Sequence, residues 1–245
     1  MGFSITGFHM RHNHGFCAST IPLRLLLVLS LMGGCAPTKP AAPTTKAASP
    51  DPKRFEAKVA AFEKEDQQSP SPAKPILFVG SSTIAIWKTS DDYPGLPVLN
   101  RGIGASHISD VLYFYDRLVL RYHPKTIVFY SGDNDLANGK PPAQVAQDAK
   151  TFIDKVRHDL PQARLVFIAV KPSNARWNLI EQIRQTNQMI RKLVEAKSGD
   201  VFLDVESQVL GPDGKPRPEL FRADGLHFSA KGYEMLNEAV RPYVH

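Results

Sequence analysis

Short apolar runs alternate regularly with longer segments of helical periodicity along most of this chain. The apolar runs are residues 76–79, 98–99, 126–130, 165–170 and 201–205. Apolar residues at helical spacing fill 106–122, 142–159, 176–197 and 229–241. Strands that are apolar throughout are buried on both faces, and helices between them allow parallel pairing. The sequence therefore predicts an α/β domain, a doubly wound, five-stranded parallel sheet with helices on both faces.

The predicted domain begins near residue 53, where Phe55, Val59 and Phe62 recur at helical spacing. We expect one domain over 53–245, because neither an internal repeat nor a second alternating region is visible. A domain of this size buries roughly 70% of the surface of its unfolded chain, which is enough for a core and a pocket. Lys and Arg outnumber Asp and Glu by 30 to 24 but form no basic run, so the charge indicates no nucleic-acid partner.

The first residues have the composition of an export signal. Residues 1–34 contain no Asp or Glu, and Arg11 and Arg24 precede an apolar core at 25–32. That core is too short to span a membrane, and small residues follow it, as in a secretory signal peptide. The alternative, a buried amphipathic helix, would need polar residues at helical period, whereas the core contains only Ser30.

Cys35, the residue directly after this segment, indicates which kind of export signal it is. Gly33 and Gly34 followed by Cys35 resemble the lipobox of bacterial lipoproteins, with Met32 where that family usually has Leu. The resemblance implies that Cys35 becomes the lipidated first residue and anchors the chain to a membrane. With Ala36 after the cysteine, it implies export to the bacterial cell envelope, at the periplasmic face of the outer membrane. The alternative is an ordinary exported protein with an unpaired Cys35.

Residues 35–52 differ in composition from both the signal and the domain. They include five prolines and almost no large apolar side chain. Such a segment cannot bury enough surface to offset the entropy lost on ordering. We therefore expect a disordered, extended tether between the lipidated cysteine and the domain.

Polar residues follow the predicted strands, at the sheet edge where doubly wound folds bind ligands. After the first strand, Gly80 allows a sharp turn and Ser82 presents a hydroxyl at a helix N-terminus. Asp224 lies three residues before His227, and such a carboxylate can set the tautomer of a general base. The structural alternatives are a helix N-cap for Ser82 and a surface turn for His227. His107 is the competing histidine near a strand end.

Two further segments offer donors for a negatively charged oxygen. Asn134 follows the third strand, and its amide NH2 is of the kind that stabilises an oxyanion. The turn after the second strand contains Gly104 and Ala105, whose backbone N–H groups can face a ligand. The alternatives are a turn rich in Asp and Asn and a plain loop. Four distant segments thus reach one edge of the predicted sheet, and that coincidence favours nucleophilic catalysis by a serine.

These segments resemble the blocks of the SGNH, or GDSL-type, hydrolase family over roughly residues 75–245. The resemblance implies a flavodoxin-like fold with a catalytic centre made of Ser82, His227, Asp224, Asn134, Ala105 and Gly104. Ser81 stands where most members have Asp, as in a Gly-Ser-Ser branch of the family. Ala105 occupies the position of the donor glycine in the second block. An alanine at that position lowers stability only where the backbone requires a positive φ. The phrase at 171–174 also resembles that branch. We expect Lys171 there to be a solvated loop residue, and the alternative is a contact with substrate.

The expected reaction is ester hydrolysis through an acyl-enzyme intermediate. His227, held by Asp224, takes the proton of Ser82, while the N–H groups of Ser82 and Ala105 and the amide of Asn134 hold the oxyanion. The sequence contains no metal-ligand spacing such as H-E-x-x-H, so neither a metal nor another cofactor is implied.

The expected substrate is a short-chain ester. No long apolar insertion separates the segments, which favours acetyl groups on a polysaccharide or on another small ester of the cell envelope. Three alternatives stay open: a lysophospholipase, an O-acyltransferase that uses the same residues, and a catalytically silent binding lipoprotein.

Overall fold

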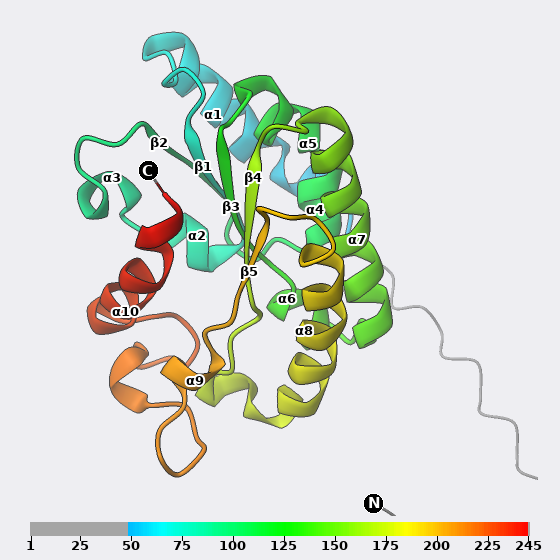
Figure 1. The fold of residues 1–245 in the computed structure, drawn as a ribbon, viewed down its shortest axis with the longest axis vertical. Helices are drawn as coiled ribbons and strands as arrows, with labels where there is room; N and C mark the ends of the chain where they lie inside the picture. The colour runs from blue at the N-terminus through cyan, green and yellow to red at the C-terminus, as the bar shows by residue number, and fades with distance from the viewer. Residues whose placement is uncertain (1–48, 245) are drawn as a thin grey trace, which may run out of the picture. The chain divides into compact units, whose positions relative to one another are not determined.

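The computed structural model describes residues 49–244, and Figure 1 shows their fold. The predicted signal peptide at 1–34, Cys35 and most of the predicted tether lie outside the described residues. Five strands form one parallel sheet: β1 (Ile76–Gly80), β2 (Val98–Gly102), β3 (Thr126–Tyr130), β4 (Arg164–Ile168) and β5 (Val201–Leu203). The expected five-stranded parallel sheet is confirmed.

Helices cover both faces of this sheet (Figure 1). One face carries α1 (Glu56–Gln68), α4 (Ile108–Tyr113), α5 (Tyr115–Leu118), α7 (Pro142–Asp159) and α8 (Ile180–Val194). The other carries α2 (Ser82–Ile86), α3 (Thr89–Asp92), α9 (Glu206–Val209) and α10 (Ala230–Val240). Successive strand residues point to opposite faces, so Leu77 joins the first apolar core and Phe78 the second. Within residues 49–244, no helix is long and apolar enough to cross a membrane.

The order of the strands locates the ligand-binding edge. Across the sheet they run β2-β1-β3-β4-β5, so the chain reverses its direction of travel between β1 and β3. Gly80, the last residue of β1, pairs with Tyr130 of β3 at this point. Its φ is +139°, and a Cβ there would lie 1.9 Å from the carbonyl oxygen of Tyr130. Glycine is therefore required where the chain leaves β1 beside β3.

The predicted helix at 106–122 is interrupted in the structure. It consists of α4, α5 and a 3-10 turn at Leu120–Tyr122. Phe114 separates the first two parts with φ −97° and ψ 15°, outside the helical region. The apolar side chains still face the sheet, since Ile108 and Leu118 are both fully buried. The periodicity thus predicted the buried face but not the breaks.

The strand predicted at 165–170 ends two residues early. Val170 is as buried as a strand residue, but its N–H and C=O bond to the side chain of Asn187 on α8, at 2.9 and 2.8 Å. Those bonds replace the ladder to β5, which itself ends at Leu203 rather than at residue 205. The chain after β4 is therefore free to turn across the edge of the sheet.

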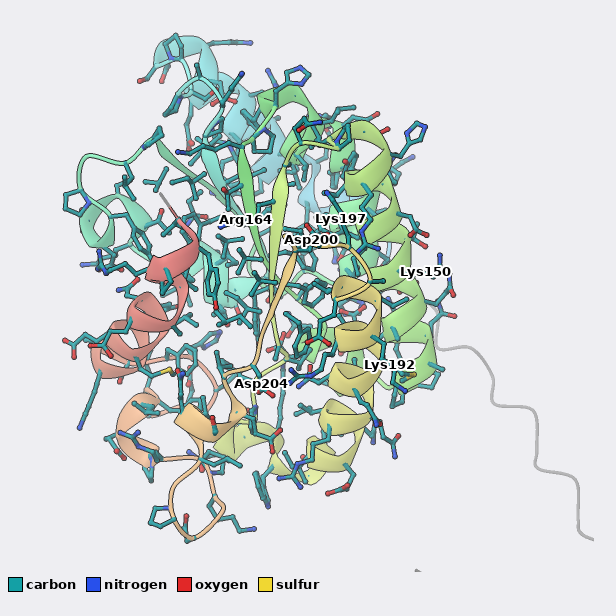
Figure 2. All side chains as sticks on the ribbon, in the orientation of Figure 1. Lys150, Arg164, Lys192, Lys197, Asp200 and Asp204 are labelled. Atoms are coloured by element: carbon teal, nitrogen blue, oxygen red, sulfur yellow. The ribbon has the colours of Figure 1, made fainter. Side chains whose placement is uncertain are left out.

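Asp200, the residue directly before the edge strand β5, forms hydrogen bonds to neighbouring parts of the domain. Asp200 accepts the backbone N–H of Leu165 at 3.1 Å and bonds Arg157 at 3.3 Å. Figure 2 shows Asp200 beside Lys197, which lies 3.8 Å away. Because β5 has only three residues, these side-chain contacts supplement a short hydrogen-bond ladder.

Candidate active site

Three side chains from two distant parts of the sequence meet at the carboxyl edge of the sheet. Ser82 is the first residue of α2, directly after the turn that leaves β1. The Nε2 atom of His227 lies 3.1 Å from the Ser82 Oγ, across 145 positions of sequence. The Nδ1 atom of the same ring lies 2.7 Å from Asp224 Oδ2. The contacts run from a hydroxyl through an imidazole to a carboxylate, an arrangement that can move a proton away from the hydroxyl.

The loop that carries this histidine is closed by its own aspartate. Asp224 Oδ1 accepts the backbone N–H groups of Leu226 and His227, both at 2.9 Å. The bond to the His227 ring and these two backbone bonds hold the pKa of Asp224 well below its usual range. The carboxylate therefore stays ionised and orients the ring, although the Asp224 side chain is 47% exposed.

Asn134 lies in α6 (Asp133–Ala137), the short helix that follows β3. Its Nδ2 donates to the carbonyl of Ser106 at 3.1 Å, and its Oδ1 accepts from Arg176 at 2.7 Å. An amide NH2 has two hydrogens, so a second one is available for a ligand. Ser106 lies in the turn after β2, so this bond joins two of the predicted site segments.

The turn after β2 exposes both predicted backbone donors. Gly104 and Ala105 are exposed, and the N–H of Ser106 closes the turn on the carbonyl of Ile103 at 3.3 Å. Ala105 has a φ of +60°, a left-handed conformation that glycine adopts readily and alanine does not. An alanine there costs about 1 kcal/mol or more. The sequence predicted this loss of stability only for a positive φ at Ala105, and the φ is positive.

Asn100 has a structural role that the sequence did not reveal. Its Nδ2 donates to the carbonyls of Ile84 and Trp87 at 2.8 and 3.1 Å, and its Oδ1 accepts the N–H of Gly102 at 2.9 Å. A Cβ on Gly102 would lie 2.3 Å from the backbone nitrogen of Ala85. The Asn-Arg-Gly phrase thus allows β2 to pack directly on α2 and satisfies the carbonyl groups at the end of that helix.

The prediction that Lys171 is a solvated loop residue is wrong. It is 3% exposed, and its Nζ donates to the carbonyl of Leu226 at 2.9 Å. The rings of Tyr130, Phe221 and Phe228 surround the ammonium, with centroids 5.7, 5.8 and 5.1 Å away. Burial lowers its pKa to about 8. The six-residue apolar run before it ends at Val170, so no local pattern in the sequence indicates that the lysine is buried as well.

His107, the competing histidine, lies elsewhere. It is 1% exposed, and its Nε2 is 2.7 Å from the amide nitrogen of Asn138. Burial lowers its pKa, while the nearby carboxylate of Asp135, 3.8 Å from Nδ1, opposes that change. Asp135 is itself bonded to Lys140 at 2.7 Å. His107 is thus part of a buried polar cluster and not a partner of Ser82.

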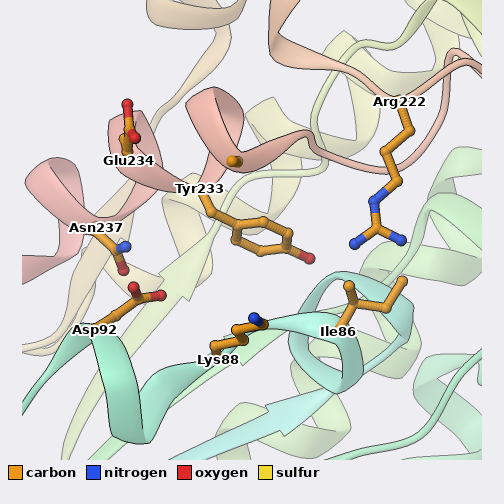
Figure 3. A pocket seen from close by; sticks show the side chains of 8 residues that line it. Ile86, Lys88, Asp92, Arg222, Tyr233, Glu234 and Asn237 are labelled. Carbon is orange, nitrogen blue, oxygen red and sulfur yellow. The ribbon is translucent and has the colours of Figure 1, made fainter.

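A cavity of about 270 Å³ lies beside α2 (Figure 3). It is lined by Ile86, Lys88, Asp92, Arg222, Ala230, Tyr233, Glu234 and Asn237. Figure 3 shows the Tyr233 ring across it, and its hydroxyl donates to the carbonyl of Thr83 at 2.8 Å. Most of the lining side chains can form hydrogen bonds. Among residues 49–244, no group of three or more His, Cys, Asp or Glu side chains is placed to hold a metal ion.

The sequence model of the GDSL-like Lipase/Acylhydrolase family matches residues 87–235. The chain belongs to this family. The match includes Asn134, Asp224 and His227 and begins five residues after Ser82. Members of the family are esterase-type hydrolases, so the expectation that this acylhydrolase is an enzyme is confirmed.

Solved structures share the fold of this acylhydrolase at low sequence identity. A protein proposed to be a platelet activating factor, from Streptococcus pneumonia, has a TM-score of 0.70 and 22% identity, over 78% of this chain and 94% of its own. A GDSL-like lipase from Bacteroides thetaiotaomicron has a TM-score of 0.65 and 18% identity, over 79% and 97%. A mutant acetylxylan esterase from Geobacillus stearothermophilus has a TM-score of 0.57 and 14% identity, over 71% and 96%. A search of the curated proteins found no match.

Proposed function

We propose that this acylhydrolase is a serine esterase in which Ser82 is the nucleophile, His227 the general base and Asp224 the residue that orients the base. The observation that carries the proposal is the 3.1 Å contact between Ser82 Oγ and His227 Nε2, with Asp224 bonded to the opposite ring nitrogen. A serine hydroxyl is a weak nucleophile until a neighbouring base removes its proton.

In the first step, Ser82 Oγ attacks the ester carbonyl while its proton passes to His227 Nε2. The resulting oxyanion lies near the start of α2, where the first N–H groups of a helix have no partner within the helix. The N–H groups of Ser82 and Ala105 and the second N–H of Asn134 hold it. His227 then protonates the departing alcohol, and the acyl group stays on Ser82.

The second step releases the acid. His227, neutral again, takes a proton from a water molecule, and the hydroxide attacks the acyl carbonyl of Ser82. The same donors hold the second oxyanion, which collapses as the bond between the acyl carbon and Ser82 Oγ breaks, while His227 returns the proton to Oγ and the acid leaves. Asp224 keeps its charge throughout and stabilises the imidazolium that forms in each step.

We further propose a short acyl group, acetyl above all, on a carbohydrate or another polar alcohol. Among residues 49–244, Tyr113 is the only large apolar side chain with high exposure, so that part of the chain offers no cluster of strongly exposed apolar side chains for a long acyl chain. A protein described as an acetylxylan esterase has a similar fold.

Three measurements test these proposals together. Wild-type protein should hydrolyse p-nitrophenyl acetate, react with a fluorophosphonate probe at Ser82, and lose rate as the acyl chain lengthens. Ser82→Ala should lose several orders of magnitude in kcat and all labelling. The exposed Ser207→Ala is the matched control and should keep both. Equal hydrolysis by wild type and Ser82→Ala would show that Ser82 is not the nucleophile and favour a binding lipoprotein.

The alternatives for the substrate give different products. An acetylated donor with and without an oligosaccharide distinguishes free acetate, expected from an esterase, from acetate transferred by an O-acyltransferase. Faster turnover of a lysophospholipid than of acetylated xylan would favour the lysophospholipase and overturn the short-chain proposal.

We also propose that Cys35, outside the described residues, carries a lipid that anchors the chain to the cell envelope, at the outer membrane. The proposal rests on the composition of residues 1–35 and their resemblance to a lipobox. Metabolic labelling with palmitate should mark the wild-type chain but not Cys35→Ala. Labelling of both to the same extent would refute the assignment.

A further inference from the structure

Arg176 links the turn after β4 to the oxyanion side of the site. It lies in the 3-10 segment η3 (Asn174–Leu179). Its Nη1 donates to Asp133 Oδ2 and its Nη2 to Asn134 Oδ1, both at 2.7 Å. The Arg176 side chain is 17% exposed and Asp133 is 4% exposed. These are close, charge-assisted bonds in a largely shielded position, and such bonds are stronger than those between neutral groups.

The chemistry of the guanidinium group determines how the Asn134 amide is turned. Arginine has only donors, so the atom of Asn134 that faces Arg176 must be the carbonyl oxygen. The amide NH2 then faces the opposite way, where the Ser106 carbonyl accepts one of its hydrogens at 3.1 Å. Arg176 therefore holds the amide in the orientation that leaves the remaining N–H available at the site.

The pair with Asp133 keeps the guanidinium in place. One nitrogen is held by a carboxylate and the other by the amide oxygen, so the planar group is fixed at two points. The backbone N–H of Asn134 also donates to Asp133, at Oδ1, over 3.0 Å. The carboxylate thus orients both the backbone of Asn134 and the cation that orients its side chain.

We propose that Arg176 is a positioning residue that sets the Asn134 carboxamide for oxyanion binding. This inference rests on the proposed function, in which Asn134 holds the oxyanion. A donor that is already oriented needs no reorganisation when the charge develops, which is where such groups contribute most. Loss of Arg176 therefore acts on the transition state and not on binding of the ester.

A double-mutant cycle on the full-length protein tests this role with p-nitrophenyl acetate. We expect Arg176→Gln to lower kcat by about tenfold with KM changed less than about twofold, and Asn134→Ala to lower kcat by about 10²–10³. In the Asn134→Ala background, Arg176→Gln should have almost no further effect, because the amide that it orients is gone.

Two further variants control for folding. Arg176→Lys keeps a cation for the buried Asp133 but lacks the planar fork, so its thermal midpoint should stay near the wild-type value while kcat remains low. Arg184→Gln removes an exposed arginine that pairs with Glu206 and Glu181, and it should leave kcat unchanged.

The outcomes separate this inference from the proposed function. If Ser82→Ala retained activity, the serine esterase proposal itself would fail. If Ser82→Ala were inactive but Arg176→Gln matched wild type, raised only KM, or lowered kcat equally with and without Asn134, only the role of Arg176 would be overturned. A silent Asn134→Ala would likewise overturn it, because there would be no oxyanion donor to position.

Discussion

Replacing Lys171 with Met should change how the stability of this acylhydrolase depends on pH. The residue is 3% exposed, and its ammonium is surrounded by three aromatic rings and donates to the Leu226 carbonyl at 2.9 Å. Burial, opposed by the field of Asp133 and reinforced by that of Arg176, lowers its pKa from 10.5 to about 8. In the unfolded chain the same lysine has its ordinary pKa of about 10.4.

The free energy of unfolding responds to this difference in one direction. Below pH 8 the lysine is protonated in both states, so it adds no pH dependence. Between about pH 8 and 10.5 the unfolded chain binds a proton that the folded chain does not, so the free energy of unfolding rises with pH. A difference of roughly 2.5 between the two pKa values corresponds to about 3 kcal/mol. Lys171→Met lacks the group and should lack this rise.

Urea unfolding followed by tryptophan fluorescence measures the effect, since Trp87 is buried in the core beneath α10. The difference in the free energy of unfolding, wild type minus Lys171→Met, should increase by about 3 kcal/mol from pH 7 to pH 10.5. Using the difference cancels the titration of groups common to both proteins, and the exposed Lys192→Met serves as the control substitution. A constant difference across this range would refute a buried, charged Lys171.

Three other substitutions, with Gly139→Ala as the control for the first, test the geometry of the site. Gly80→Ala would place a Cβ 1.9 Å from the carbonyl oxygen of Tyr130 and should lower the free energy of unfolding by more than about 3 kcal/mol. Gly139 also has a positive φ, but no atom lies within 4 Å of the position of its Cβ, so Gly139→Ala should lower that free energy by only about 1 kcal/mol. Equal costs in urea unfolding would contradict the steric reasoning. Asn134→Ala should reduce kcat by about 10²–10³ in the esterase assay, and a wild-type rate would exclude Asn134 as an oxyanion donor. Ala105→Gly should relieve the left-handed conformation at φ +60° but increase the entropy of the unfolded chain, so its unfolding free energy should change by less than about 1 kcal/mol with activity retained. A loss of more than about tenfold in kcat would argue against a backbone donor there.

Local patterns in the sequence were sufficient to predict the architecture. A strand buried on both faces must be apolar throughout, so Ile76–Val79 and Thr126–Tyr130 were recognisable without knowledge of their neighbours. The helix at Pro142–Asp159 has the bounds that its periodicity predicted. Parallel strands bring their carboxyl ends to one edge, so the segments carrying Ser82 and Asn134 were expected to lie at the same edge of the sheet. These predictions needed only the local pattern of apolar residues and the general geometry of parallel sheets.

The residues that support the site could only be found in the tertiary structure. Lys171 was expected to be a solvated loop residue and Arg176 to begin a helical segment, yet their partners Leu226 and Asn134 lie 55 and 42 positions away. Whether such a side chain is buried depends on which distant loop packs over it, and no local periodicity records that. The sequence by itself thus determined the sheet, its helices and the segments at its edge. Long-range packing alone decided which carbonyl, amide and aromatic groups surround each cation, because those contacts join parts of the chain that have no relation to one another until the domain has folded.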